Sequence, residues 1–121
     1  YYNHYVYKYS PFGVYTVIAG ENGTAGISDG TGTAARFNFP SGIAVDVIGN
    51  LYVCDAFNNR IRKISASGVV TTLAGNDPGL MDGIGSGASF DTPLGICGDF
   101  ENKAVYVADY NKKKIRKLIV D

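Results

Sequence analysis

The hydrophobic positions of this chain fall in short segments that are separated by turn residues. In the middle of the chain these segments are Gly42–Asp46, Leu51–Asp55, Arg60–Ile64 and Val69–Leu73. Gly49-Asn50 and Phe57-Asn58-Asn59 lie between the first three, and Asn and Gly tolerate the positive φ angles that tight turns require. The pattern therefore predicts four short antiparallel strands.

This pattern is repeated along the chain. Pro40–Ile64 appears again, in altered form, as Pro93–Leu118. The opening segments, Tyr5–Tyr9 and Val14–Ile18, match the second half of the same unit with an offset of 55 positions. Repeats of about 50 residues are typical of propellers, solenoids and arrays, and four short strands per unit favour the blades of a β-propeller.

A long connection, residues 21–39, precedes the first complete unit, and residues 76–92 take the same place before the second. Both contain an Asp-Gly pair, Asp29-Gly30 or Asp82-Gly83, and both then contain a phenylalanine, Phe37 or Phe90. A loop of this length without regular structure is uncommon in a compact domain. We therefore expect each loop to fold back and to be anchored by its aromatic ring.

The first unit reads Pro-Ser-Gly-Ile-Ala-Val-Asp, then Leu-Tyr-Val-Cys-Asp, then Asn-Asn-Arg-Ile-Arg-Lys-Ile, with Asp-Gly-x-Gly-x-x-x-x-Phe upstream. In these strings the chain resembles the NHL repeat family. The resemblance implies an all-β fold of propeller blades, each of four antiparallel strands, in a ring of about six blades. It also implies a surface that binds other macromolecules. The second unit departs at Cys97-Gly98 and Asn111–Lys114, which changes any binding surface built there.

The repeat divides the chain into three parts. Residues 1–20 match the last two strands of a preceding blade, 21–75 form a blade with a long loop before it, and 76–121 form a blade that lacks its outer strand. About two and a half blades cannot close a ring, which needs at least ~4. Either the chain is a segment of a longer propeller, or copies of it assemble into a ring or filament. In both cases the edges at Tyr5–Ile18 and Lys114–Val120 need a partner, since unpaired strand edges recruit other strands.

Composition and charge narrow the classes of partner. Eleven Lys and Arg balance eleven Asp and Glu, so no overall field draws nucleic acid to the chain, and no apolar run is long enough to span a membrane. The cluster Lys112–Lys114, with Arg116 and Lys117, resembles in residue type the basic surfaces by which some NHL propellers bind RNA. Together with Arg60, Arg62 and Lys63 of the first unit it would form a basic stripe across adjacent blades. The alternative is a solvated turn whose aliphatic stems pack against neighbouring blades while the charged ends reach water, and the zero net charge favours it.

The chain offers little for catalysis, so we expect no enzymatic activity, no cofactor and no metal from these residues. His4 is the only histidine and reads as an exposed or packing residue. The carboxylates at strand ends, Asp46, Asp55, Asp99 and Asp109, are expected to accept turn N–H groups, with cation binding as the alternative. Some NHL-like propellers are lyases or hydrolases that use His and metal. That possibility would place the catalytic residues in blades outside this chain.

The leading interpretation is a non-enzymatic structural or protein-interaction module whose partner is protein, namely further blades or other copies. Its expected interaction surface consists of Tyr5, Tyr7, Tyr9, Tyr15, Lys114, Arg116 and Leu118. The sequon at Asn22 favours glycosylation and an extracellular or secretory setting. Cys54 and Cys97 form either a disulfide between adjacent units or two buried free thiols.

Overall fold

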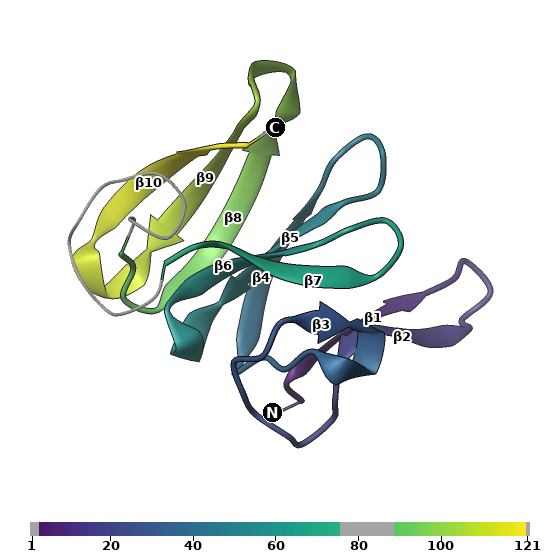
Figure 1. Cartoon of the computed structure of the whole chain (residues 1–121). Coiled ribbons are helices and arrows are strands. Elements are labelled where there is room, and N and C mark those ends of the chain that lie inside the picture. The colour runs from purple at the N-terminus through teal and green to yellow at the C-terminus, as the bar shows by residue number, and fades with distance from the viewer. Residues whose placement is uncertain (1–2, 76–88, 121) are drawn as a thin grey trace.

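A computed structural model of the chain describes residues 3–75 and 89–120 as three antiparallel sheets set side by side (Figure 1). The first sheet, here called the half-blade, pairs β1 (Tyr5–Tyr9) with β2 (Tyr15–Gly20). The Ser10 side chain stabilises the turn between them by accepting the N–H groups of Phe12 and Val14. The sequence predicted this hairpin, with β2 ending two residues later than expected.

The second sheet, the first blade, contains the four predicted strands in the order β4-β5-β6-β7, with β3 added beside β7. Their bounds are β3 (Gly30–Thr31), β4 (Pro40–Val45), β5 (Leu51–Asp55), β6 (Arg60–Ile64) and β7 (Val69–Ala74). The strand β3 was not predicted. It forms because the long loop folds back and pairs its Gly30 and Thr31 with Val70 and Val69 of β7.

The third sheet, the second blade, has the order β10-β9-β8. Its strands are β8 (Pro93–Asp99), β9 (Ala104–Asp109) and β10 (Lys114–Ile119). Within residues 89–120 no fourth strand covers the outer edge of β10. A blade without its outer strand was the expectation from the repeat, while the exact division at residues 20 and 75 stays a prediction.

Short 3-10 turns lie between the strands: three occupy the short connections, and the first lies in the long loop that precedes β4. They are η1 (Gly32–Ala34), η2 (Ala56–Asn58), η4 (Phe100–Asn102) and η5 (Tyr110–Lys112). The last three end in a left-handed residue, and at Asn59 φ is 56°. Asn adopts this conformation more readily than most residues, which explains the Asn-rich connection between β5 and β6.

Two hydrophobic clusters join the sheets. One lies between the half-blade and the first blade and contains Phe37, and the other lies between the two blades and contains Phe90. Both rings are fully buried, so the prediction that the long loops are anchored by an aromatic ring is confirmed for the described residues. Asp82-Gly83 lies outside the described residues. Glycine allows the blades to approach closely, because a Cβ on Gly42 of β4 would stand 2.6 Å from the Leu94 carbonyl oxygen of β8.

Candidate interaction surfaces

The interior of the first blade is organised around one buried arginine. Arg62 on β6 is fully buried and donates to the Asp55 carboxylate at 2.7 Å and to the Asp29 carboxylate at 2.8 Å. It also donates to the backbone carbonyls of Arg36 and Ser28, and its guanidinium carbon lies 5.0 Å from the centre of the Phe37 ring. Arg62 therefore ties the long loop to the blade. Burial of Asp55 raises its pKa, and the donors at Asn38, Asn58 and Arg62 oppose that rise.

The second blade repeats this arrangement. Arg116 donates to the Asp109 carboxylate at 2.9 Å and to the Ser89 carbonyl at 2.8 Å, and it lies over the Phe90 ring at 5.1 Å. Asp109 also accepts the backbone N–H of Asp91, as Asp55 accepts that of Asn38. These carboxylates therefore accept turn N–H groups as expected. Asp55 and Asp109 also form buried ion pairs, with Arg62 and Arg116, which the sequence did not predict.

These ion pairs correct two expectations. Arg62 and Arg116 were expected to send their charged ends to water, but their guanidinium groups are buried beside carboxylates, so they cannot belong to a basic surface stripe. Arg116 and Leu118 were also expected at an interaction surface, and both are buried because they face the first blade. On this strand Lys114, Ile115, Lys117 and Ile119 are exposed.

The tyrosines of the half-blade form one cluster, in which Tyr7, Tyr9 and Tyr15 are exposed and Tyr5 is half-buried. Tyr5, Tyr7 and Tyr9 follow alternate positions of β1, and Tyr15 of β2 lies opposite Tyr9. The ring centres of Tyr7 and Tyr15 are 5.1 Å apart, and those of Tyr9 and Tyr15 are 5.6 Å apart. The Tyr15 hydroxyl donates to that of Tyr5, and this hydrogen bond raises the pKa of Tyr15 to about 12. We call these four residues the tyrosine face.

The tyrosine face occupies a position that is covered elsewhere in the molecule. Counting 55 positions forward along the repeat, Tyr9 corresponds to Ile64 and Tyr15 corresponds to Val70. Ile64 and Val70 are buried against the half-blade, at 0% and 1% exposure, whereas Tyr9 and Tyr15 are 63% and 44% exposed. The tyrosine face is therefore a blade-packing face that lies open in this chain.

His4 has a structural role that the sequence did not reveal. Its side chain is buried, and Nδ1 accepts the backbone N–H of Phe39 at 3.0 Å. Asn59 stands 55 positions later and accepts the N–H of Thr92 through its side-chain oxygen at 2.8 Å. Each contact therefore joins one sheet to the next. The repeat itself held the signal, since His4 aligns with an asparagine whose side chain also offers an acceptor.

The two cysteines are free thiols, so the disulfide considered from the sequence does not form in this structure. Cys54 lies in the cluster between the blades, and burial raises its pKa to about 12. Cys97 on β8 is exposed, so the expectation of two buried thiols is wrong for this residue. Cys54 is accordingly a small apolar core residue.

The remaining candidate chemistry is sparse. Asp46 accepts the N–H groups of Ile48 and Asn50, as expected for a carboxylate beside a turn. Slight burial acts to raise its pKa, but hydrogen bonds from Asn50, Ile48 and Tyr52 outweigh it and hold the pKa below the ordinary value.

Within residues 3–75 and 89–120, no group of three or more His, Cys, Asp or Glu is placed to hold a metal ion, and no helix is long and apolar enough to span a bilayer. Asn22 is exposed within the turn that the Thr24 N–H closes on the Glu21 carbonyl oxygen.

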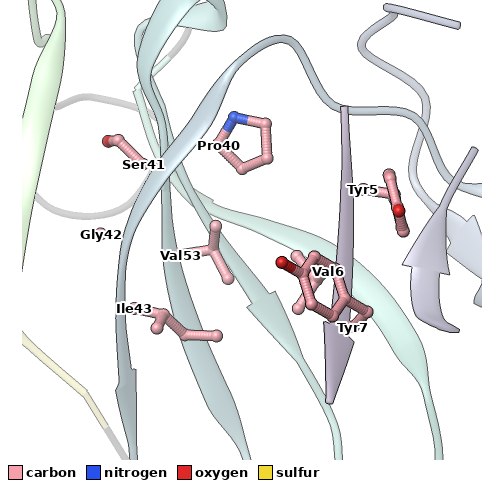
Figure 2. Close-up of a pocket in the computed structure, with 8 residues that line it drawn as sticks. All are labelled: Tyr5, Val6, Tyr7, Pro40, Ser41, Gly42, Ile43 and Val53. Atoms are coloured by element: carbon pink, nitrogen blue, oxygen red, sulfur yellow. The ribbon is translucent and has the colours of Figure 1, made fainter. Parts of the chain in front are cut away.

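A cavity of about 320 Å³ opens between the half-blade and the first blade. Figure 2 shows the residues that line it, among them Tyr5, Val6 and Tyr7 of β1. The residues from the first blade are Pro40, Ser41, Gly42, Ile43 and Val53. We call this cavity the β1 groove.

Comparison with known proteins gives repeat-containing relatives. A model of the NHL repeat matches residues 37–64. NHL repeat-containing protein 2 of Bos taurus is 34% identical over 94 residues, which cover 74% of this chain and 13% of the relative. Protein SUPPRESSOR OF QUENCHING 1, chloroplastic, of Arabidopsis thaliana is 34% identical over 95 residues, which cover 77% of this chain and 9% of the relative.

Solved structures share the fold over nearly the whole chain. A structural genomics protein of unknown function from Bacteroides thetaiotaomicron superposes with a TM-score of 0.87 at 33% identity, covering 96% of this chain and 30% of that one. An auxiliary nutrient binding protein from the same species gives a TM-score of 0.83 at 26% identity, covering 96% and 32%. The all-β propeller fold is confirmed, and the chain spans about a third of these structures and less of the curated relatives.

Proposed function

Because the chain belongs to the NHL-repeat family of β-propellers, we propose that it is a non-enzymatic protein-interaction module within a longer propeller. One observation carries this proposal: Tyr7, Tyr9 and Tyr15 of the tyrosine face are exposed at repeat positions that are buried in the first blade. Tyrosine gives a large contact area at low entropic cost and is enriched at protein interfaces. The face therefore has the position and the chemistry of a protein contact.

The test is whether the tyrosine face drives association. Sedimentation velocity of the chain over a range of concentrations should show self-association through this exposed face. Replacing Tyr7, Tyr9 and Tyr15 together with serine should abolish that association. Matched replacement of the exposed Phe12, Val14 and Phe57, which lie outside the tyrosine face, should leave it unchanged. A monomer at every concentration would contradict an adhesive face, and loss in both variants would show that general hydrophobicity is responsible.

RNA binding is the second candidate, and the observation in its favour is the exposed group Lys113, Lys114 and Lys117. The burial of Arg62 and Arg116 removes two of the charges on which a wider stripe would depend. A filter-binding titration against single-stranded RNA at several salt concentrations separates the candidates, since each phosphate contact steepens the salt dependence. We expect weak binding without such a slope.

The proposed setting is extracellular or the secretory pathway, supported by the exposed sequon at Asn22. A secreted form expressed in a eukaryotic host should carry one N-glycan, which peptide N-glycosidase removes with a single decrease in mass. Asn22→Gln is the matched control and should abolish the decrease. Quantitative secretion of an unglycosylated chain would remove the support for this setting.

A further inference from the structure

A second cavity, smaller than the β1 groove, lies between the two blades. Its volume is about 150 Å³. The residues that line it come from the turn between β4 and β5, from the turn between β8 and β9, and from the end of β10: Asp46, Val47, Ile48, Phe100, Lys103 and Val120. We call this cavity the turn pocket. Its lining belongs to the two blades, so it is a different surface from the tyrosine face.

One wall of the turn pocket depends on a departure from the repeat. Gly98 on β8 stands where the first blade has Val45. A Cβ on Gly98 would stand 2.1 Å from the Phe100 ring, so the ring lies directly on this glycine. The same ring stacks on Tyr52 of β5, with the ring centres 5.3 Å apart. The glycine therefore lets Phe100 fold back and form an aromatic wall.

The opposite wall is an apolar turn. Val47 and Ile48 are 95% and 73% exposed. Asp46 already stabilises this turn by accepting the N–H groups of Ile48 and Asn50, so the turn does not need apolar side chains at its tip. Polar residues and glycine are the usual choice at such positions. Val47 and Ile48 are β-branched and therefore stiff, and they present a preformed apolar surface at the pocket.

The size of the turn pocket limits what it can hold. A cavity of about 150 Å³ accommodates benzene, which is close in size to one leucine side chain. Sites for larger organic ligands enclose roughly 300 Å³ or more. The turn pocket therefore fits a single aliphatic side chain.

The two charged side chains of the lining differ in the bonds that they can still make. The Asp46 carboxylate accepts four hydrogen bonds from its own turn and from Tyr52, which fills its about four lone-pair sites. Lys103 is exposed, and within the described residues its ammonium group has no hydrogen bond or ion pair. Glu101 is exposed nearby but does not line the pocket. The charged group that remains free to bind an occupant is a cation, which favours a carboxylate next to the apolar group.

We infer that the turn pocket binds a short protein segment in which an aliphatic residue is followed by an acidic one. The aliphatic side chain enters between the β4–β5 turn and the Phe100 ring, and the carboxylate pairs with Lys103. This contact goes beyond the proposed function, because it uses the turn end of the two blades and none of the tyrosines of the half-blade.

A titration with three peptides tests the inference. The first is acetyl-Gly-Ser-Leu-Glu-Ser-Gly-amide, and the other two replace its Glu with Lys or its Leu with Ser. Added to the isotope-labelled chain, the first peptide should shift the amide signals of Val47, Ile48 and Lys103 in NMR spectra, with a dissociation constant in the millimolar range. The Lys peptide should bind about three- to fivefold more weakly, as expected for one exposed ion pair. The Ser peptide should bind at least about tenfold more weakly, because no aliphatic group is buried.

Variants of the chain assign each part of the contact. Lys103→Glu should reverse the preference, so that the Lys peptide binds more tightly than the Glu peptide. Lys114→Glu, the matched control at an exposed position outside the pocket, should leave the preference unchanged. Gly98→Val should weaken binding of the first peptide, because the added side chain displaces the Phe100 ring. Thermal unfolding of each variant shows whether it is folded.

Four results would overturn the inference. They are equal binding of the Glu and Lys peptides, shifts confined to residues outside the turn pocket, an unchanged preference in Lys103→Glu, and no binding of any peptide. Shifts at Val47 and Ile48 that appear when the chain alone is concentrated would make a second copy the occupant. Binding to phosphatidylcholine vesicles that Ile48→Ser removes, without a response to peptides, would make a lipid surface the occupant.

The tyrosine face and the turn pocket can be tested separately. The variant in which Tyr7, Tyr9 and Tyr15 are replaced with serine should bind the first peptide as the wild type does. If that variant alone loses association while the peptides fail on both chains, the proposed function stands and this inference falls. If the peptides bind and no association through the tyrosines is found, the reverse holds.

Discussion

Arg62 of the first blade and Tyr7 of the half-blade occupy the same position of the repeat, yet their surroundings are opposite. Arg62 is fully buried among carboxylates and carbonyl groups, whereas Tyr7 is 42% exposed and contacts other tyrosines. The two sheets have the same backbone geometry here. Gly20 in the half-blade and Gly75 in the first blade each lie so close to a backbone carbonyl oxygen, of His4 and of Asn59, that a Cβ would not fit. A face of a blade therefore becomes part of the hydrophobic core where a neighbouring sheet packs on it. Where no sheet packs on it, as at Tyr7, the face carries amphipathic side chains.

The largest expected effect is the difference in stability lost when Arg62 or Tyr7 is replaced. Arg62→Met leaves Asp55 buried without its cation and releases the loop at Asp29, so we expect a loss of about 3–5 kcal/mol in the free energy of unfolding. Tyr7→Ser removes a half-exposed ring and should cost about 1 kcal/mol or less. Urea denaturation of both variants measures the difference. Similar losses would show that the ion pair adds no more than the aromatic contact.

A double variant identifies the origin of that loss. Asp55→Asn combined with Arg62→Met removes both charges, so the pair should lose less than the sum of the two single variants, with a coupling of about 1–3 kcal/mol. Strict additivity would mean that the two side chains act independently. The free energies again come from urea unfolding.

The second expected effect tests whether the half-blade and the first blade share one backbone geometry. Gly20 and Gly75 both have positive φ, and an added Cβ would stand 2.7 Å from the His4 carbonyl oxygen in one and 2.5 Å from the Asn59 carbonyl oxygen in the other. Gly20→Ala and Gly75→Ala should each cost about 1–3 kcal/mol, because both the φ angle and the close approach are violated. Gly68→Ala has a similar φ but no neighbour within 4 Å, so it should cost less. Thermal unfolding of the three variants ranks them.

The sequence predicted the strands better than it predicted their contacts. The bounds of β5 and β6 agree with the prediction because Asn and Gly turns flank both strands. The strand β3 was missed, since a two-residue edge pair depends on the position of β7 and not on local pattern. Pairing of Arg62 with Asp55 was missed because an arginine in a mixed strand is ordinarily exposed. The recurrence of the same Asp-to-Arg spacing in the second blade was the available signal.

The candidate interaction surface was predicted only in part, because strand periodicity shows which residues share a side but not what packs against that side. The tyrosines of β1 alternate along a strand, so their shared exposed side follows from residue type and period. Leu118 and Arg116 also alternate on β10, but local sequence does not say which side of a strand meets the neighbouring blade. The β1 groove is lined by β1 on one side and by β4 and β5, at least 33 positions later, on the other, so no local pattern reveals it.

The third expected effect concerns the hydrogen bonds that join one sheet to the next. His4→Ala removes the acceptor for the Phe39 N–H and should cost about 1–2 kcal/mol, because a buried donor loses its partner. His4→Asn introduces the residue found at the equivalent Asn59 and should retain most of the stability. The free energy of unfolding of the two variants gives the answer. Equal losses would mean that the imidazole contributes by packing alone.

The smallest expected effect compares the turns that follow the inner strands of the two blades. Asp46 accepts four hydrogen bonds, from Ile48 N–H, the backbone and side chain of Asn50 and the Tyr52 hydroxyl. Asp99, its equivalent, accepts one from the Asn102 side chain. Asp46→Asn should therefore destabilise the chain at pH 7 by up to about 1 kcal/mol, and Asp99→Asn should do so by less.

The pH dependence of Asp46→Asn has a defined sign. The folded pKa of Asp46 lies below its ordinary value of 3.8, so the folded state favours the ionised carboxylate. This contribution is fully present above the unfolded pKa and is lost as the pH falls through the folded pKa. The difference in unfolding midpoint between wild type and Asp46→Asn should accordingly be constant from pH 6 to 8 and shrink below about pH 4. A difference that persists at low pH would mean that the carboxylate charge has no part in stabilising the turn.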